Sequence, residues 1–314
     1  MEAREETEYL LELKRRRRAR RMPWVRFKKH LVYFPAVAVV LLLDSLSRPV
    51  SLALGRLIGF CFSLIPSRHL RRAVENLKIA FPEKSHTERL RIARKVFVNL
   101  GRVAAETAAL RHNAGRFEGI VACDRSVEIL ENVLARGRGC IIVATHLNCW
   151  ELLVAYMSHR FGAPAVKKKF KFDKFTQFTE AMREEAGTLV FDVDDFDEVK
   201  RAVDTNVPIV ILPDLDMKKK TSITVKFFGK DAAVVRGPAV LALRNRTPIV
   251  CVFFHWNGRL NVLECAGPIE IPGGGLTDEN QCIVTEAYMR EIERAISKYP
   301  DQWPWFHDRW GKAE

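Results

Sequence analysis

Residues 31–66 most strongly constrain how the chain can fold, because they hold two short apolar runs with a charged boundary between them. Leu31–Leu43 contains thirteen residues and no charge, and Val50–Pro66 is interrupted only by Arg56. A helix of thirteen residues is about 20 Å long, shorter than the roughly 30 Å hydrocarbon core of a bilayer. We therefore expect two short helices that lie in a membrane interface or form a shallow hairpin, with two buried helices of a soluble domain as the alternative.

The net charge of +13 is concentrated just before these runs. Ten Lys or Arg residues and no acid lie between Lys14 and Lys29, and residues 1–30 carry eleven basic and five acidic residues, about +6. Such an excess points to a polyanionic partner: nucleic acid, anionic lipid headgroups or a phosphorylated substrate. Since the arm adjoins apolar helices, we interpret it as binding an anionic membrane surface and expect no nucleic-acid partner.

The seven cysteines indicate a reducing compartment. They are scattered, contain no Cys-x-x-Cys pair and have mostly apolar neighbours, so we expect reduced thiols and no metal site. We also expect no cleavable signal peptide, because the apolar stretch begins only after thirty polar residues.

The rest of the chain alternates between helical and strand patterns. Residues 67–112 are predicted to be helical, with a break at Phe81-Pro82 and Ser85 as an N-cap. Beyond residue 126, short apolar runs typical of buried strands are separated by helical stretches, which predicts an α/β sheet. These runs are Cys140–Thr145, Val207–Leu212 and Pro248–Phe254. We divide the chain into a basic arm (1–30), apolar membrane-associated helices (31–66) and an α/β domain (67–314).

A histidine and a glutamate follow the first of these strands. His146 comes directly after the apolar run, and Asn148 is a suitable N-cap for a helix that carries Glu151 in its first turn. Ligands of open α/β sheets bind at the carboxyl ends of strands. A carboxylate beside an imidazole there would fix its tautomer and make the free nitrogen a better base. The alternative is a structural histidine and a glutamate that only stabilises the helix start.

Other polar groups offer weaker candidates. Asp214 and Asp216 follow the second predicted strand and lie at the same kind of strand end. The acidic stretch Asp192–Asp197 is interpreted as an exposed turn or helix start rather than a cation site. Lysines cluster at residues 167–174 and 218–226, where they would either receive phosphates or form a solvated face.

Taken together, the segments resemble the bacterial lipid A biosynthesis acyltransferases, a branch of the lysophospholipid and glycerolipid acyltransferase superfamily. The resemblance extends over roughly residues 31–313. Its markers are Asn76–Pro82, Gly139 through His146 and Glu151, Pro213–Asp216, Phe227–Gly229, Gly237–Ala239 with Leu241–Arg244, and Gln302–Trp310.

The resemblance implies a fold and an activity. The fold is α/β, with a central mixed sheet flanked by helices and with membrane-associated helices at the N-terminus. The activity is transfer of a fatty acyl chain from acyl-carrier protein to a hydroxyl of a Kdo-lipid A precursor. His146 would be the general base and Glu151 its orienting partner. The thioester is a co-substrate, so neither a cofactor nor a metal is expected.

The resemblance also implies a set of substrate-binding residues. The family commonly has an Arg, and an Asn four residues later, after the second strand; Lys169 and Asp173 stand there in this chain. Lysine lacks the bidentate fork of arginine, and we assign Arg236 as a compensating anion ligand. The substrate-binding set is Asn148, Lys169, Asp214, Asp216 and Arg236.

Both the basic arm and acyl-carrier protein belong on the cytosolic side, so we expect the protein on the cytoplasmic face of the inner membrane. Two other functions stay open. One is acylation of another membrane lipid, a phosphatidylinositol mannoside or a lysophospholipid, from acyl-CoA or acyl-carrier protein. The other is a non-catalytic basic protein that binds a membrane or nucleic acid.

Overall fold

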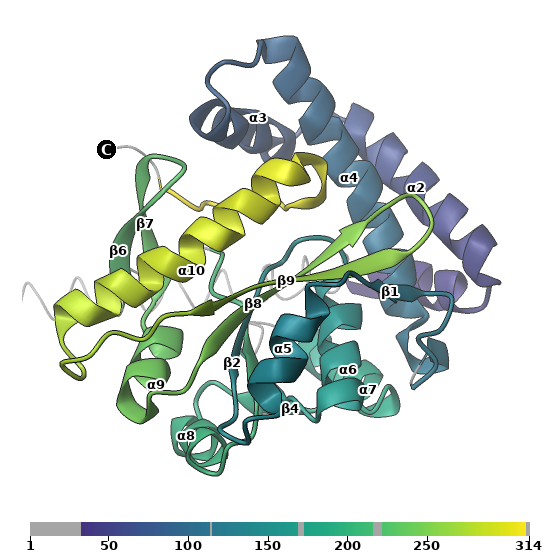
Figure 1. Ribbon diagram of the computed structural model, residues 1–314. Helices are drawn as coiled ribbons and strands as arrows, with labels where there is room; N and C mark the ends of the chain where they lie inside the picture. Colours follow the sequence, from purple (N-terminus) through teal and green to yellow (C-terminus); the bar gives the residue numbers. More distant parts are fainter. Residues whose placement is uncertain (1–32, 114, 169–172, 216–221, 312–314) are drawn as a thin grey trace, which may run out of the picture.

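The apolar run after residue 139 lies at the centre of the molecule. The structure, a computed structural model, describes residues 33–113, 115–168, 173–215 and 222–311. In it, β2 (Ile141–Ala144) is completely buried within a seven-stranded sheet of order β1-β9-β8-β2-β5-β3-β4 (Figure 1). The other strands are β1 (Val121–Cys123), β3 (Ala165–Lys167), β4 (Val190–Asp192), β5 (Ile209–Ile211), β8 (Ile249–Trp256) and β9 (Asn261–Ile269).

The sheet is mixed. Strands β8, β2, β5, β3 and β4 run parallel to one another, β9 is antiparallel to β8, and β1 is parallel to β9. In the register of the two central strands, Ile141 lies opposite Ile209 and Val143 opposite Ile211. The residues that follow β2 and β5 therefore emerge side by side at the carboxyl edge of the sheet.

Alternate residues of β2 point into two separate cores, as the period of a strand requires. Ile141 and Val143 pack with helices on one face of the sheet, whereas Ile142 and Ala144 pack with helices on the other. The first face is covered by α8 (Phe196–Asp204), α9 (Gly237–Asn245) and α10 (Asp278–Lys298), together with the hairpin of β6 (Ser222–Phe227) and β7 (Lys230–Val235). The second face is covered by α5 (Val127–Leu134) and α6 (Trp150–Phe161). The predicted mixed α/β sheet flanked by helices is confirmed.

Helices precede the sheet, as predicted. They are the helix Tyr33–Asp44, α2 (Arg48–Leu64), α3 (Arg68–Ala80) and α4 (His86–Ala108). Ser85 caps α4 in a reciprocal capping box: its hydroxyl accepts from the Glu88 amide, and the Glu88 carboxylate accepts from the Ser85 amide. Val96 of α4 belongs to the first core and Val103 to the second, so α4 bridges both layers. The basic arm, residues 1–30, lies outside the described residues.

Helix α2 buries its small side chains and exposes its large ones. Its buried residues recur every fourth position: Ser51, Gly55, Gly59 and Ser63. This small face packs against α4, as in closely packed membrane helices. Bulky apolar side chains on the other faces are half exposed or more, at 50–61%: Val50, Leu57, Phe60, Phe62 and Leu64. No single described helix has the length and hydropathy needed to cross a bilayer. Helices α2 and α3 have the required length and hydropathy only when taken together, and they are bent by 86° relative to each other.

Replacing Gly59 with Ala is expected to lower the free energy of unfolding by about 1–3 kcal/mol. Alanine is the better helix former by about 1 kcal/mol, but its Cβ would overlap the carbonyl oxygen of Phe97 in α4. Thermal unfolding of the purified protein measures the change. Gly237→Ala, at the first residue of α9, is the control without a steric clash, because the nearest atom to a Cβ there is 3.9 Å away. A higher Tm for Gly59→Ala would contradict the close contact of α2 with α4.

Candidate active site

His146 lies at the carboxyl edge of the sheet, two residues after β2, as predicted. Its Nδ1 is 2.7 Å from Oδ1 of Asp214, and its backbone amide donates to Oδ2 of the same carboxylate over 2.9 Å. Asp214 follows β5, the parallel neighbour of β2. The strand order therefore brings together two residues that are 68 positions apart in the chain.

The Asp214 side chain is fully buried and receives three hydrogen bonds. Besides the two from His146, Nε1 of Trp303 donates to Oδ2 over 2.8 Å. Burial alone would raise the pKa of this carboxyl, but the charge and hydrogen bonds of His146 and the bond from Trp303 together lower it below its ordinary value of 3.8. The ionised carboxylate accepts from Nδ1, which assigns the proton to Nδ1 and leaves Nε2 as the free base.

The lowered pKa of Asp214 also links the site to stability. Since the folded state holds the proton less tightly than the unfolded state, ionisation of Asp214 stabilises the fold above its ordinary pKa of 3.8. That contribution is lost as the pH falls through the lower, folded pKa.

The Glu151 carboxylate pairs with Arg183 and not with His146, its expected partner. Glu151 lies in the first turn of α6, and its carboxylate accepts two hydrogen bonds from Arg183, of 2.9 and 2.6 Å, and one from Trp150. Burial by itself would lower the pKa of the Arg183 guanidinium. The hydrogen bonds and the charge of Glu151 outweigh this effect and raise that pKa. The contact expected between Glu151 and His146 is instead made by Asp214, because β5 is the direct neighbour of β2 in the sheet and the Glu151 carboxylate bonds to Arg183.

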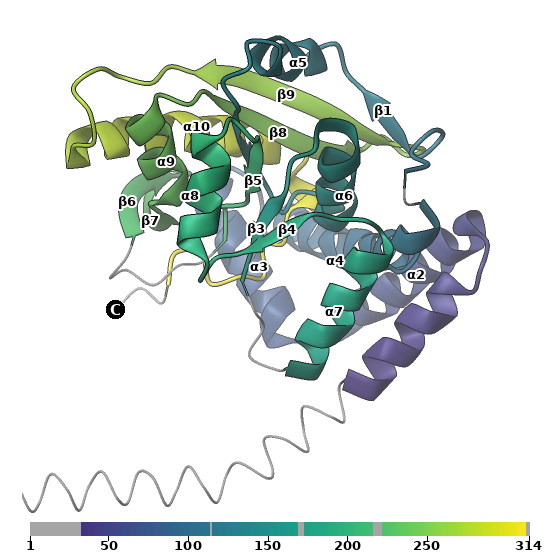
Figure 2. The ribbon, with the colours of Figure 1, turned by 90° about the horizontal axis from the view of Figure 1, so that it is seen from below.

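A cavity of about 590 Å³ lies beside His146. Charged residues in its lining include Glu151, Lys168 and Arg183. The apolar lining comes from the helix Tyr33–Asp44, from α4 and α6, and from α7 (Asp173–Glu185), which lies near α4 in Figure 2. Its main members are Val40, Leu100, Val103, Val154, Phe178 and Met182. A largely apolar pocket with a few convergent polar groups suits a ligand with a long hydrocarbon chain and one reactive end.

Comparison with protein families assigns the chain to a family. The family model for bacterial lipid A biosynthesis acyltransferases matches residues 20–312. The chain belongs to this family. It is therefore an acyltransferase. A comparison with curated proteins found no significant match.

The other sequence-predicted residues of the acyltransferase lie in varied surroundings. Asn148 is buried, and its backbone is left-handed with φ of 58°. Because α6 begins only at Trp150 with Cys149 at the N-cap, Asn148 is not the predicted cap. Arg236 pairs with Asp278 (3.0 Å) at the start of α10 and does not line the described part of the cavity. Lys169 and Asp216 lie outside the described residues.

A buried polar network holds Asn148 in place. Nη2 of Arg102 donates to its Oδ1, and its Nδ2 donates to Asn261 over 2.9 Å. Glu106 accepts from Asn261 (3.2 Å) and from Arg48 of α2 (2.7 Å). Arg102 and Glu106 are 1% and 0% exposed, four residues apart on α4. The network ties the loop after His146 to α4 and α2; sequence analysis missed it, although two charges in an otherwise apolar helix face were the available signal.

Replacing Asn148 with Ala is expected to destabilise the acyltransferase by about 1–3 kcal/mol more than the same change at Asn206. Both asparagines have left-handed backbones, with φ of 58° and 63°, so the strain imposed on alanine is the same. Asn206 is exposed, whereas Asn148 satisfies buried partners. Chemical unfolding of both variants measures the difference; equal losses would show that the network contributes nothing.

Proposed function

We propose that the protein is a membrane-associated O-acyltransferase that moves a fatty acyl chain from acyl-carrier protein to a hydroxyl of a Kdo-lipid A precursor. The observation that carries this proposal is the pair of His146 with the buried Asp214, because His146 lines a largely apolar cavity. The pair supplies a base for an alcohol, and the cavity supplies a dry slot for a hydrocarbon chain. Family membership supports lipid A as the class of acceptor.

In the proposed reaction, Nε2 of His146 removes the proton of the acceptor hydroxyl as its oxygen attacks the thioester carbonyl. A new C–O bond forms, and the carbonyl oxygen carries the negative charge of the tetrahedral intermediate. The intermediate then collapses with cleavage of the C–S bond, and His146 returns the proton to the leaving thiolate. Asp214 keeps Nδ1 protonated and stabilises the imidazolium.

Positive groups of the cavity support the charged steps. Arg183 and Lys168 line it with His146 and are suited to stabilise the developing oxyanion or a phosphate of the acceptor. In this proposal Glu151 acts by fixing Arg183 rather than by orienting His146. Lys169 and Asp216 stay proposed acceptor ligands on sequence grounds.

Attachment to the cytoplasmic face of the inner membrane is also proposed. Its support is the half-exposed apolar face of α2 together with the strongly basic sequence of residues 1–30, a combination that favours an anionic membrane interface. Cysteine labelling from the periplasmic side tests it. Labelling of a cysteine introduced at Glu314 by a membrane-impermeant reagent in intact cells would contradict it.

A substrate panel tests the activity. Purified protein is incubated with each acceptor and with either acyl-carrier protein thioester or acyl-CoA, and the lipids are analysed by mass spectrometry, with His146→Gln as the inactive control. We expect a gain of one acyl chain on the Kdo-lipid A precursor from the carrier-protein donor. Activity confined to a lysophospholipid or a phosphatidylinositol mannoside would contradict the proposed acceptor.

A further inference from the structure

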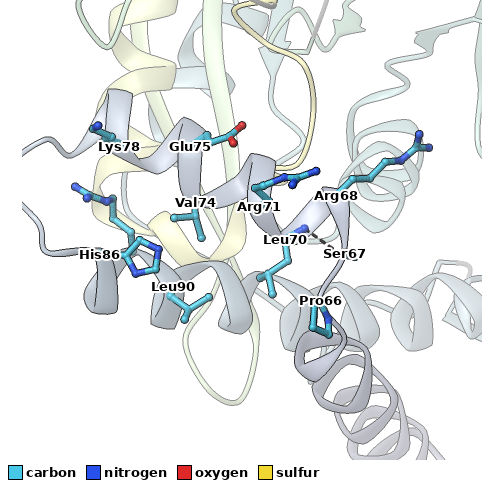
Figure 3. Close-up of a pocket in the computed structure, with 11 residues that line it drawn as sticks. Pro66, Ser67, Arg68, Leu70, Arg71, Val74, Glu75, Lys78, His86 and Leu90 are labelled. Atoms are coloured by element: carbon cyan, nitrogen blue, oxygen red, sulfur yellow. Dashed lines mark hydrogen bonds between the residues drawn. The ribbon is translucent and has the colours of Figure 1, made fainter.

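A second cavity, of about 530 Å³, lies between α3 and the start of α4. We call it the elbow groove, because it lies next to the bend between α2 and α3. Figure 3 shows Leu70 and Val74 of α3 near His86 and Leu90 of α4, with Arg71 and Lys78 also along α3. The groove shares no residue with the cavity at His146.

The elbow groove carries uncompensated positive charge. Its Arg and Lys residues are Arg68, Arg71, Lys78 and Arg89, and its one acid is Glu75. None of the four cations forms an ion pair within 4 Å with a described residue. Burial, together with the charges of Arg68 and Arg72, lowers the pKa of the neighbouring His69. The groove is therefore a region of positive potential within the described part of the chain.

Two features of the backbone and side chains favour an anion there. The first turn of α3 contains no acid, although the partial positive charge of a helix N-terminus favours negative groups. Instead, Arg68 and Arg71 add positive charge to it. Moreover, Nε of Arg89 is buried and has no hydrogen-bond acceptor among the described residues. A phosphate bound in the groove would compensate the positive charge at the start of α3.

The surface beside the groove is apolar and basic at once. Phe60, Leu64 and Ile65 at the end of α2 are 50–53% exposed. Phe60 and Leu64 line a depression of about 300 Å³ that shares Leu90 with the elbow groove and also contains three cations: Arg91, Arg94 and Lys95. Large apolar side chains flanked by Lys and Arg suit the boundary between acyl chains and phosphates of a bilayer. This favours a lipid surface over an acidic protein.

We propose that the elbow groove binds the phosphate of an anionic phospholipid headgroup while the exposed end of α2 enters the acyl region beside it. The other face of α3 links this contact to the active site, because Asn76 donates to the carbonyl oxygens of Trp305 (2.6 Å) and His307 (2.8 Å). His307 lines the cavity at His146. Lipid bound in the groove would thus fix one wall of that cavity relative to the membrane surface.

Vesicle flotation of the full-length protein tests the proposal. The double variant Arg71→Gln, Lys78→Gln removes two exposed groove charges. The double variant Arg201→Gln, Arg244→Gln removes two exposed charges on α8 and α9, at the opposite end of the molecule from α3 (Figure 1). Thermal unfolding checks that both double variants are folded. A third variant, Arg71→Lys, Lys78→Arg, exchanges the two side chains but keeps both positive charges of the groove.

On phosphatidylcholine vesicles containing phosphatidylglycerol, we expect the groove variant to lose about 30-fold in partition coefficient, at about 1 kcal/mol per charge. The control variant and the variant Arg71→Lys, Lys78→Arg should keep most of their affinity for these vesicles. Inorganic phosphate should displace the protein more strongly than chloride of equal ionic strength. Equal losses in groove variant and control would overturn the proposal, as would equal effects of phosphate and chloride.

Two further outcomes would also overturn it. If the groove variant binds vesicles normally but loses affinity for acyl-carrier protein, the groove takes an acidic protein instead. If it loses affinity for inorganic phosphate alone, the groove takes a free anion rather than a headgroup. All readouts are binding measurements, so they do not depend on the proposed acyl transfer.

Discussion

Replacing His146 with Ala or Gln is expected to lower kcat for acyl transfer by about 10²–10⁴-fold, the usual contribution of a positioned general base. The alanine variant removes the imidazole and also one of the hydrogen-bond donors to the buried Asp214. The glutamine variant keeps an amide donor for that carboxylate but has no basic nitrogen. Loss of activity in both variants would therefore reflect the missing base rather than a damaged fold.

The measurements are steady-state rates together with thermal unfolding. His159→Ala is the matched control, since His159 lies on α6 and its Nε2 bonds to the carbonyl oxygen of Ala186 (2.8 Å), outside the described cavity lining. We expect its rate to change little. Full activity in a folded His146→Gln protein would exclude the mechanism proposed for His146.

Replacing Asp214 with Asn is also expected to lower kcat by about 10²–10⁴-fold. The backbone amide of His146 and the indole N–H of Trp303 both donate to Oδ2, so the single oxygen of an asparagine would turn toward them. Its NH₂ group would then donate to Nδ1 of His146. That contact places the imidazole proton on Nε2 and blocks the base.

The companion variant Glu151→Gln distinguishes the role of the Glu151 carboxylate from that of the Asp214 carboxylate. Since Glu151 bonds to Arg183 and not to His146, we expect a smaller loss of kcat than for Asp214→Asn. Steady-state kcat values of the two variants, measured under identical conditions, compare the two carboxylates. The reverse order of effects would restore Glu151 as the orienting group.

Much of the helical framework was predictable from sequence because its signals are local. The Ser85–Glu88 capping box marks the start of α4, and continuous apolar runs mark β2, β5 and β8. Strands β1, β3 and β4 were missed, because each has three residues of which at most one is buried, whereas β5, equally short, buries two. The long antiparallel β9 was missed as well. Its pairing with β8 is a tertiary contact with no local code.

The site shows the same division. Sequence alone determined that His146 and Asp214 each follow a buried strand and therefore lie at strand ends, since a continuous apolar run must be interior and its polar continuation must leave the core. It could not tell which strands are neighbours. Only the tertiary structure decided that β2 lies beside β5, that Asp214 therefore orients His146, and that α7 brings Arg183 to Glu151. These pairings depend on strand order and helix packing, which arise from the combined burial of two cores and not from any one segment.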